Sequence, residues 1–425
     1  NGTLYMSDKK IKIFTLSDHP LTPSGVGTQT RYIIEGMLRT GKYQFISFGG
    51  LIKHQDYRPI KTEEFGDDWI IVPTDGYGTA ESVRAMLWAE KPDIVWFMTD
   101  PRFWGWLWQM EEEVRYNVPM IYYHVWDNYP HPTFNKPYYD SNDFVATISK
   151  VTDDIVANVS PDVDRQYVPH AVNLDIFKPL EDDFVKKLRA DNFKDDNDKF
   201  IIFWNNRNAR RKMAATLILW FKEFLDRVGH DKAVLLMHTD PRDKAGSNLE
   251  ALIDSLGINE GQVLFSREKL HPENLAAMYN MVDCTINISD AEGFGLGTLE
   301  SLSCGTPIIV NMTGGLQEQV TDGNDWFGIG LEPTSKSIVG SQEVPFIYED
   351  RLSKEPVVEA LVEMFNKTPE ERKELGLKGR KHVEKNYNFD DFIKTWDEIF
   401  TRIHEEHGSW ETRNRKQNWT LKEIA

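Results

Sequence analysis

Two glutamates, Glu292 and Glu300, enclose a glycine-rich stretch, Glu-Gly-Phe-Gly-Leu-Gly-Thr-Leu-Glu, that has the features of a binding loop. The segment 284–288 before it, Cys-Thr-Ile-Asn-Ile, predicts a strand, and a helix is expected to begin near Leu296. Glycines let backbone N–H groups approach a ligand closely, and a helix N-terminus favours negative charge. Glu292 could accept hydrogen bonds from sugar hydroxyls. Glu300, on the first helical turns, could bind a vicinal diol such as a ribose.

A cluster of cations follows another predicted strand, residues 200–204. Four basic residues stand within six positions: Arg207, Arg210, Arg211 and Lys212. Arginine offers paired hydrogen bonds to phosphate and lysine a mobile charge. The alternative is a solvated helix start, but cations at a helix N-terminus oppose the helix dipole. The cluster therefore favours a diphosphate ligand.

Two weaker signals lie in the first half of the chain. Gly25 and Gly27 stand between a predicted strand, 11–16, and a predicted helix, 28–38. They could let amides approach a phosphate, but they form neither a full dinucleotide fingerprint nor a P-loop, so a plain tight turn stays an alternative. His124 ends a further predicted strand, where a structural role and a functional one both remain open.

An aromatic-rich segment, residues 96–108, also follows a strand. Aromatic rings can stack on sugars or bases, or they can fill a core. Both interpretations, core of the first domain and wall of an acceptor cleft, stay open at the level of sequence.

Short apolar strands alternate with helical patterns along most of the chain, which predicts an α/β protein with two tandem Rossmann-like domains and parallel sheets. The expected domains are 6–180 and 181–385, followed by a helical segment, 386–425. The polar stretch 191–199 is expected to be a linker, and the last hundred residues are expected to be mostly helical.

Composition limits the classes of function. The 425 residues carry a formal net charge of −18, which argues against coating nucleic acid by charge alone, although a local basic patch is not excluded. No apolar run reaches the roughly 20 residues of a membrane span. Two cysteines, Cys284 and Cys304, indicate no disulfide framework, so a cytoplasmic setting is expected. No hydrophobic signal core is seen at the start, where Met6 is a candidate first residue.

With these residues in view, the chain resembles the retaining family-4 glycosyltransferases, which have the GT-B fold. Their hallmark is a pair of glutamates separated by seven residues, as Glu292 and Glu300 are. The segments 299–310, 314–318 and 168–179 also resemble the family. Two departures stand out: many members have Pro at the position of Gly297, and the insert 18–23 is unusual and is a candidate acceptor segment.

The resemblance implies a role for each matching residue. Glu300 would hold the ribose of a nucleotide, and Arg207 and Lys212 the diphosphate. Glu292 would hold the transferred sugar. The remaining implied donor-binding positions are Gly25, Gly27, Gly293, Phe294, Gly295 and Leu296. His124 would lie near the reaction centre, and the C-terminal helices would cross back toward the N-terminal domain.

The resulting expectation is a retaining hexosyltransferase that moves a sugar from a UDP- or GDP-sugar to a hydroxyl acceptor. It would need no cofactor and no metal, since no Asp-x-Asp pair stands at a strand end. His124, Glu292, Arg207 and Lys212 are the expected catalytic residues. A nucleotide-sugar epimerase and a non-catalytic scaffold that binds nucleotide sugars are the alternatives. Two carboxylates alone could also suggest a glycosidase, but the cations at 207–212 favour a donor site. The acceptor, the identity of the sugar and base, and the oligomeric state are not indicated.

Overall fold

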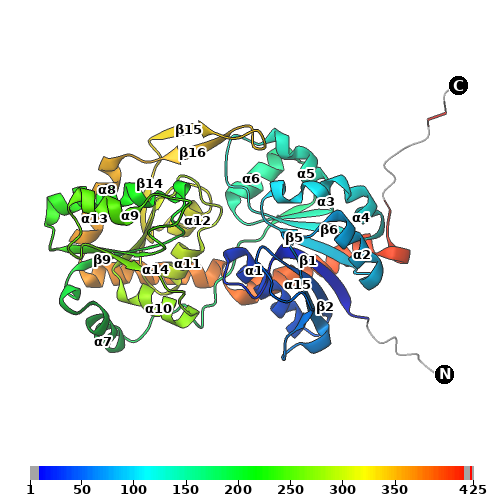
Figure 1. Ribbon diagram of the computed structural model, residues 1–425, viewed down its shortest axis with the longest axis horizontal. Coiled ribbons are helices and arrows are strands. Elements are labelled where there is room, and N and C mark those ends of the chain that lie inside the picture. The colour runs from blue at the N-terminus through cyan, green and yellow to red at the C-terminus, as the bar shows by residue number, and fades with distance from the viewer. Residues whose placement is uncertain (1–8, 416–421, 424–425) are drawn as a thin grey trace.

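The chain folds into two α/β units that lie side by side (Figure 1). The computed structural model describes residues 9–415 and 422–423. Met6, the first residues of the predicted domain 6–180 and part of the end of the predicted segment 386–425 lie outside the described residues. Each unit is built on its own parallel sheet, so the prediction of an α/β fold with two Rossmann-like domains is confirmed.

The N-terminal unit has an eight-stranded sheet in the order β3-β4-β2-β1-β5-β6-β7-β8. Neighbouring strands are parallel, except that β3 runs antiparallel to β4. The strands are β1 (Ile11–Asp18), β2 (Tyr43–Gly50), β3 (Ile60–Lys61), β4 (Trp69–Pro73), β5 (Ile94–Met98), β6 (Met120–His124), β7 (Phe144–Thr147) and β8 (Arg165–Tyr167). The central strands β5, β6 and β7 are buried along their whole length, as expected of strands covered on both faces.

Helices cover both faces of this sheet. They are α1 (Gly25–Arg39), α2 (Ala80–Glu90), α3 (Gly105–Gln109), α4 (Glu111–Asn117), α5 (Lys136–Asp140) and α6 (Lys150–Val159). Trp96 and Trp104 of the aromatic segment are buried in the core on opposite faces. The core interpretation therefore holds for these two rings.

The C-terminal unit has a six-stranded parallel sheet in the order β11-β10-β9-β12-β13-β14. Its strands are β9 (Phe200–Asn205), β10 (Ala233–His238), β11 (Val263–Ser266), β12 (Cys284–Asn287), β13 (Ile308–Asn311) and β14 (Gly328–Leu331). Its helices are α7 (Asp182–Phe193), α8 (Ala214–Val228), α9 (Leu249–Leu256), α10 (Pro272–Met281), α11 (Leu296–Ser303), α12 (Leu316–Val320), α13 (Lys354–Asn366) and α14 (Pro369–Asn386).

The stretch 191–199 is not the linker that its polar composition suggested. It holds the end of α7 and a short 3-10 turn, Lys194–Asp196. Arg189 fixes α7 to the sheet, because its guanidinium donates to the carbonyls of Asn197 and Met281 and pairs with Asp283 at 3.2 Å. These contacts explain why a polar stretch is ordered here.

A β-hairpin, β15 (Ser335–Val339) and β16 (Ile347–Arg351), interrupts the predicted helical C-terminal part. It leaves the C-terminal unit and reaches the N-terminal one (Figure 1, top). Its strands alternate only weakly between apolar and polar residues, and Ile338 is 71% exposed. A pattern with no buried face gives little strand signal, so the hairpin was not predicted.

The chain passes between the units twice, first before α7 and again after α14. The final helix, α15 (Phe389–His407), lies on the N-terminal unit against α1. Trp396 is fully buried there, with its ring 6.1 Å from that of Trp96. Trp410 packs on the opposite face of the same sheet, 5.0 Å from Trp88. Among the described residues, no helix combines the length and the apolar character that crossing a membrane requires.

Candidate active site

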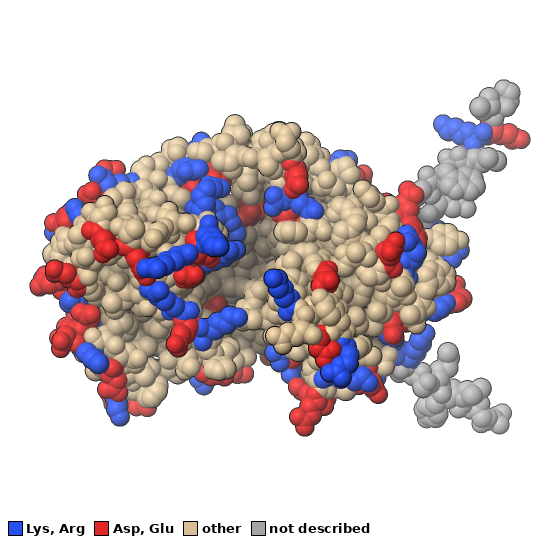
Figure 2. Space-filling view, in the orientation of Figure 1, with Lys and Arg blue, Asp and Glu red and all other residues tan. Residues whose placement is uncertain are grey.

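A cleft of about 850 Å³ separates the two units. The carboxyl ends of β1, β5 and β6 meet it on one side, and those of β9 and β12 on the other, which is where open α/β sheets bind ligands. Figure 2 shows the hollow, with Lys and Arg side chains gathered on the rim formed by the C-terminal unit. All four cations of the 207–212 cluster line it, together with residues 291–297.

The loop between β12 and α11 forms one wall of the cleft. Gly295 has a φ of 89°, a conformation that suits glycine. Gly314, between β13 and α12, also has a positive φ, of 49°, and packs against this loop. An added Cβ at Gly314 would lie 1.8 Å from the Glu292 carbonyl oxygen, so only glycine fits there. Among the described residues, none accepts a hydrogen bond from the backbone N–H of Gly293, Phe294 or Gly295. The loop therefore presents free donors beside the cleft, and the role of these residues and of Leu296 in donor binding stays a prediction.

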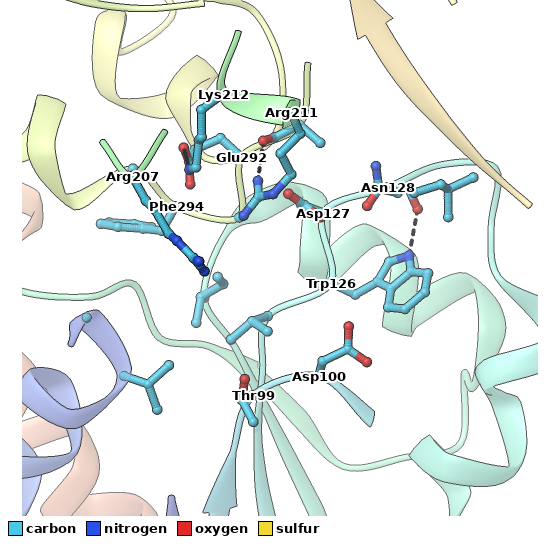
Figure 3. Close-up of a pocket in the computed structure, with 18 of the residues that line it drawn as sticks. Thr99, Asp100, Trp126, Asp127, Asn128, Arg207, Arg211, Lys212, Glu292 and Phe294 are labelled. Atoms are coloured by element: carbon cyan, nitrogen blue, oxygen red, sulfur yellow. Dashed lines mark hydrogen bonds and ion pairs between the residues drawn. The ribbon is translucent and has the colours of Figure 1, made fainter. Parts of the chain in front are cut away.

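Glu292 and Lys212 form a buried ion pair, with side chains 11% and 13% exposed. Asn287 also donates to the Glu292 carboxylate, over 3.2 Å. Burial alone would raise the pKa of Glu292, but Lys212 and Arg211 outweigh it and hold the pKa below its ordinary value. Burial lowers the pKa of Lys212, and Glu292 offsets part of that effect. Glu292 is thus ionised and held in place by cations (Figure 3).

The three arginines of the cluster differ in the partners that hold them. Arg207 is 70% exposed and donates to Asp243 over 2.9 Å, so it can turn toward a ligand at little cost. Arg210 pairs with the buried Glu349 of β16 at 2.9 Å. Arg211 donates to the Ala291 carbonyl over 2.5 Å, which fixes it to the loop. Arg207 and Arg210 are thus paired with carboxylates, whereas Arg211 is bound to the backbone of the loop.

Glu300 is partly buried on α11, one turn beyond the residues that line the cleft. Within the part of the chain that the structure describes, its carboxylate has neither a hydrogen bond nor an ion pair. Burial raises the pKa of Glu300 to about 8. Tyr32 of α1 and Tyr279 of α10 are near enough to interact with its charge. A desolvated carboxylate without a partner is costly, which indicates that a ligand supplies the missing donors.

Gly297, where the family resemblance departs, lines the cleft between these two glutamates. An added Cβ would lie 3.2 Å from the Asn205 carbonyl oxygen and 3.4 Å from the Tyr279 hydroxyl. The start of α11 therefore packs closely on the end of β9, and glycine permits this approach.

The two glycines at the start of α1, Gly25 and Gly27, have different surroundings. Gly25 lines the cleft, and an added Cβ would lie 3.3 Å from a methyl group of Leu296 across the cleft. Gly27 is not among the lining residues. Its N–H donates to the Ser24 hydroxyl that caps α1, and an added Cβ would lie 2.7 Å from the His19 carbonyl oxygen. Close packing accounts for Gly27, and its role in donor binding stays a prediction.

His124 is fully buried and does not line the cleft. Its Nε2 lies 2.6 Å from the Tyr139 hydroxyl, and burial lowers the pKa of His124 to about 3.

Asp127 lies in the loop after β6, three residues beyond His124. Its side chain is the acidic one that this loop brings into the cleft, beside Arg211 (Figure 3). Burial, aided by Glu292, raises the pKa of Asp127 to about 6 although Arg211 opposes it. Sequence reasoning missed Asp127, although its place after β6 is a signal that could have found it.

The comparisons with known proteins follow the division of the chain. Residues 184–382 match the family model of glycosyl transferases group 1. The D-inositol 3-phosphate glycosyltransferase of Paenarthrobacter aurescens (strain TC1) is 27% identical over 186 residues, 42% of this chain and 43% of that protein. That of Corynebacterium jeikeium (strain K411) is 30% identical over 159 residues, 37% of each chain. The matched part thus spans about two fifths of these curated relatives.

Solved structures match nearly the whole chain. Sucrose-phosphate synthase from Thermosynechococcus elongatus is similar with a TM-score of 0.75 and 17% identity, over 93% of this chain and 100% of that one. HepE from Anabaena, in complex with UDP and glucose, is similar with a TM-score of 0.67 and 13% identity, over 92% and 100%. At these identities the likeness shows the fold, which is GT-B. The predicted arrangement of two sheets facing across a cleft is therefore confirmed.

Proposed function

We propose that this chain, a family-4-type glycosyltransferase by its C-terminal unit and its GT-B fold, moves a sugar from a nucleoside-diphosphate donor to a hydroxyl acceptor. Transfer proceeds with retention at the anomeric carbon and needs no metal ion or other cofactor. The donor is a UDP- or GDP-hexose. HepE, a relative in fold, was solved with UDP and glucose, which supports UDP as the first donor to test.

The observation that carries the proposal is the unpartnered carboxylate of Glu300 behind a wall of cations and free amides. A ribose supplies two hydroxyl donors to that carboxylate, and accepting them favours its ionised form. Arg207 and Lys212 then face the diphosphate, which lies between the ribose and the sugar. Glu292 and the amides of residues 293–295 bind the sugar hydroxyls.

The chemistry follows from where negative charge develops. The bond between the anomeric carbon and the diphosphate oxygen breaks through an oxocarbenium-like state. Arg207 and Lys212 stabilise the charge on the departing diphosphate. The acceptor oxygen bonds to the anomeric carbon on the face that the diphosphate leaves, and its proton passes to the departing diphosphate. Glu292 orients the sugar and does not attack it, because Lys212 and Asn287 already hold its carboxylate.

The first test is a thermal-shift screen with UDP, GDP and their sugar conjugates, because a ligand that binds the folded state stabilises it by RT ln(1 + [L]/Kd). One nucleotide series should raise the melting temperature, and Glu300→Gln should reduce that effect. The most stabilising donor is then incubated with a chelator, and nucleoside diphosphate release is measured. No stabilisation by any nucleotide would refute the proposal, and conversion of the donor to its epimer would replace it.

Glu292→Gln separates the roles of the two glutamates. Turnover should fall at least tenfold, while stabilisation by the free nucleoside diphosphate should persist, because Glu292 contacts the sugar. Retention is tested by the anomeric coupling constant of the product in an NMR spectrum. An inverted product would contradict the stereochemical part of the proposal.

A further inference from the structure

The half of the cleft that faces the N-terminal unit is a second compartment, next to the donor side. Its floor is formed by the loops after β5 and β6, including Thr99, Asp100, Arg102 and residues 125–128. The turn of the β15–β16 hairpin forms its third wall, with residues 339–341 and Val344. Thr99 has a φ of 94°, a strained conformation for a residue with a side chain, and such strain is concentrated at ligand sites.

The hairpin is held at its turn by the N-terminal unit. Val344 is buried in a cluster with Trp126 and Tyr139, and the ring of Phe346 lies 5.8 Å from that of Phe134. The Tyr348 N–H donates to the Tyr129 carbonyl over 2.6 Å.

The base of the hairpin is held by the donor side. The Asp350 N–H donates to the Asp290 carbonyl over 2.8 Å, and Arg351 pairs with the Asp290 carboxylate at 3.1 Å. Since both ends are fixed, the hairpin is a wall of the compartment and not a free loop.

Charge in this compartment opposes anions. Arg102 is the cation that the N-terminal unit contributes to the lining among the described residues. Asp100 neutralises it, with an ion pair of 2.7 Å and a second hydrogen bond of 2.8 Å. Glu343 of the hairpin turn also lies close enough to interact with Arg102. No free positive charge is left on this side for a phosphate group.

Asp127 adds a carboxylate that points into the cleft (Figure 3). No other residue in the described ranges forms a hydrogen bond with its side chain. Arg211, Lys212 and Glu292 are the charged groups that face it. The free acceptor oxygens of this carboxylate suit a hydroxyl group, which donates to them, better than a phosphate group, whose oxygens are acceptors.

We propose that the acceptor is an uncharged sugar or polyol bound in this compartment, and that Asp127 accepts a hydrogen bond from its attacking hydroxyl. Phosphate esters of the same compounds are not accepted, because Asp100 and Glu343 leave Arg102 no free charge with which to bind a phosphate. This inference rests on the proposed transfer reaction, and it adds the chemical class of the acceptor and the residues that select it.

The test uses the full chain and the most stabilising nucleotide sugar. Release of nucleoside diphosphate is measured with water alone and with matched pairs: glucose and glucose 6-phosphate, mannose and mannose 6-phosphate, inositol and inositol 3-phosphate. At least one neutral compound should raise release tenfold or more, and its ester should not. A phosphate ester that exceeds its neutral parent overturns the inference. So does a donor that is hydrolysed while no neutral compound accelerates its release. Absence of donor binding and hydrolysis instead refutes the transferase proposal itself.

Two variants test the assigned residues. In the double variant Asp100→Asn, Glu343→Gln, Arg102 is left unpaired, so the rate with the ester relative to its neutral parent should rise at least tenfold. Adding Arg102→Gln should abolish that gain. An unchanged ratio would show that these charges do not select the acceptor.

Asp127→Asn should lower kcat with the acceptor at least tenfold, with little change in the Kd for the nucleoside diphosphate. The wild-type rate should rise with pH through an apparent pKa near that of Asp127, about 6. This rise should be lost in Asp127→Asn and kept in Asp127→Glu. A purely structural role would instead lower the affinity for nucleotide and leave the pH profile unchanged.

Discussion

Replacing Glu300 by glutamine should stabilise the protein without ligand and weaken its binding of nucleotide. In the folded chain the pKa of Glu300 is raised from 4.5 to about 8, because its partly buried carboxylate is desolvated and has no partner. Between those values the unfolded state has lost the proton that the folded state still holds. The free energy of unfolding of the wild type therefore falls as pH rises through this interval.

The size of the effect follows from the two pKa values. At pH about 5 the lost stability amounts to about 0.8 kcal/mol, and at pH about 7 to about 3.4 kcal/mol. Glutamine cannot ionise, so the stability of Glu300→Gln relative to wild type should increase by roughly 2.5 kcal/mol between these pH values. Urea unfolding followed by tryptophan fluorescence, at both pH values, measures this difference.

Glu349→Gln is the matched control. Glu349 is also buried, but Arg210 pairs with it and, with Arg351, holds its pKa below the ordinary value despite burial. Its ionised form stabilises the fold above the ordinary pKa of glutamate, and that contribution is lost as pH falls. Glu349→Gln should therefore destabilise the protein at neutral pH. If both variants lose stability, or if the advantage of Glu300→Gln does not grow with pH, the description of Glu300 as an unsatisfied carboxylate is wrong.

Three further outcomes follow from contacts in the same unit. Lys212→Met should destabilise the protein by about 3–5 kcal/mol, because it leaves the Glu292 carboxylate buried and unpaired. The double variant with Glu292→Gln should regain most of that stability in urea unfolding, but it should have no transferase activity. Gly314→Ala should abolish donor binding and lower the melting temperature, since its Cβ would overlap the Glu292 carbonyl, whereas Gly323→Ala, also at positive φ but in open space, should bind donor normally. Trp396→Ala should lower stability by about 3–5 kcal/mol, because this ring fills the N-terminal core. The Kd for nucleotide should stay nearly unchanged in protein that remains folded, because the ring lies away from the donor. An equal loss of stability and of nucleotide affinity would show that the units do not act separately.

Much of the fold could be read from the sequence because its strands are buried on both faces. Such strands are continuous apolar runs, as in residues 94–98 and 200–204. The loop before α11 could be placed because its glycines follow the strand at 284–287 and precede the helix, as the structure has them.

Other features depend on contacts between distant parts of the chain. The hairpin is polar and exposed along most of its length, and Val344 at its turn is buried by residues two hundred positions earlier. That His124 points into the core while Asp127 faces the cleft is decided by how the loop leaves β6. The missing partner of Glu300 is a property of the folded surroundings, and no local pattern records it.

The return of α15 to the N-terminal unit has a consequence for synthesis. The apolar cluster on the outer face of the C-terminal sheet is made from residues between Phe200 and Met364. The core of the N-terminal unit, in contrast, includes Trp396 and Trp410. On the ribosome the strands of the N-terminal sheet thus emerge early. Their core is complete only when Trp396 and Trp410 have been translated, after the whole C-terminal unit. The half of the chain that is made first is therefore completed last.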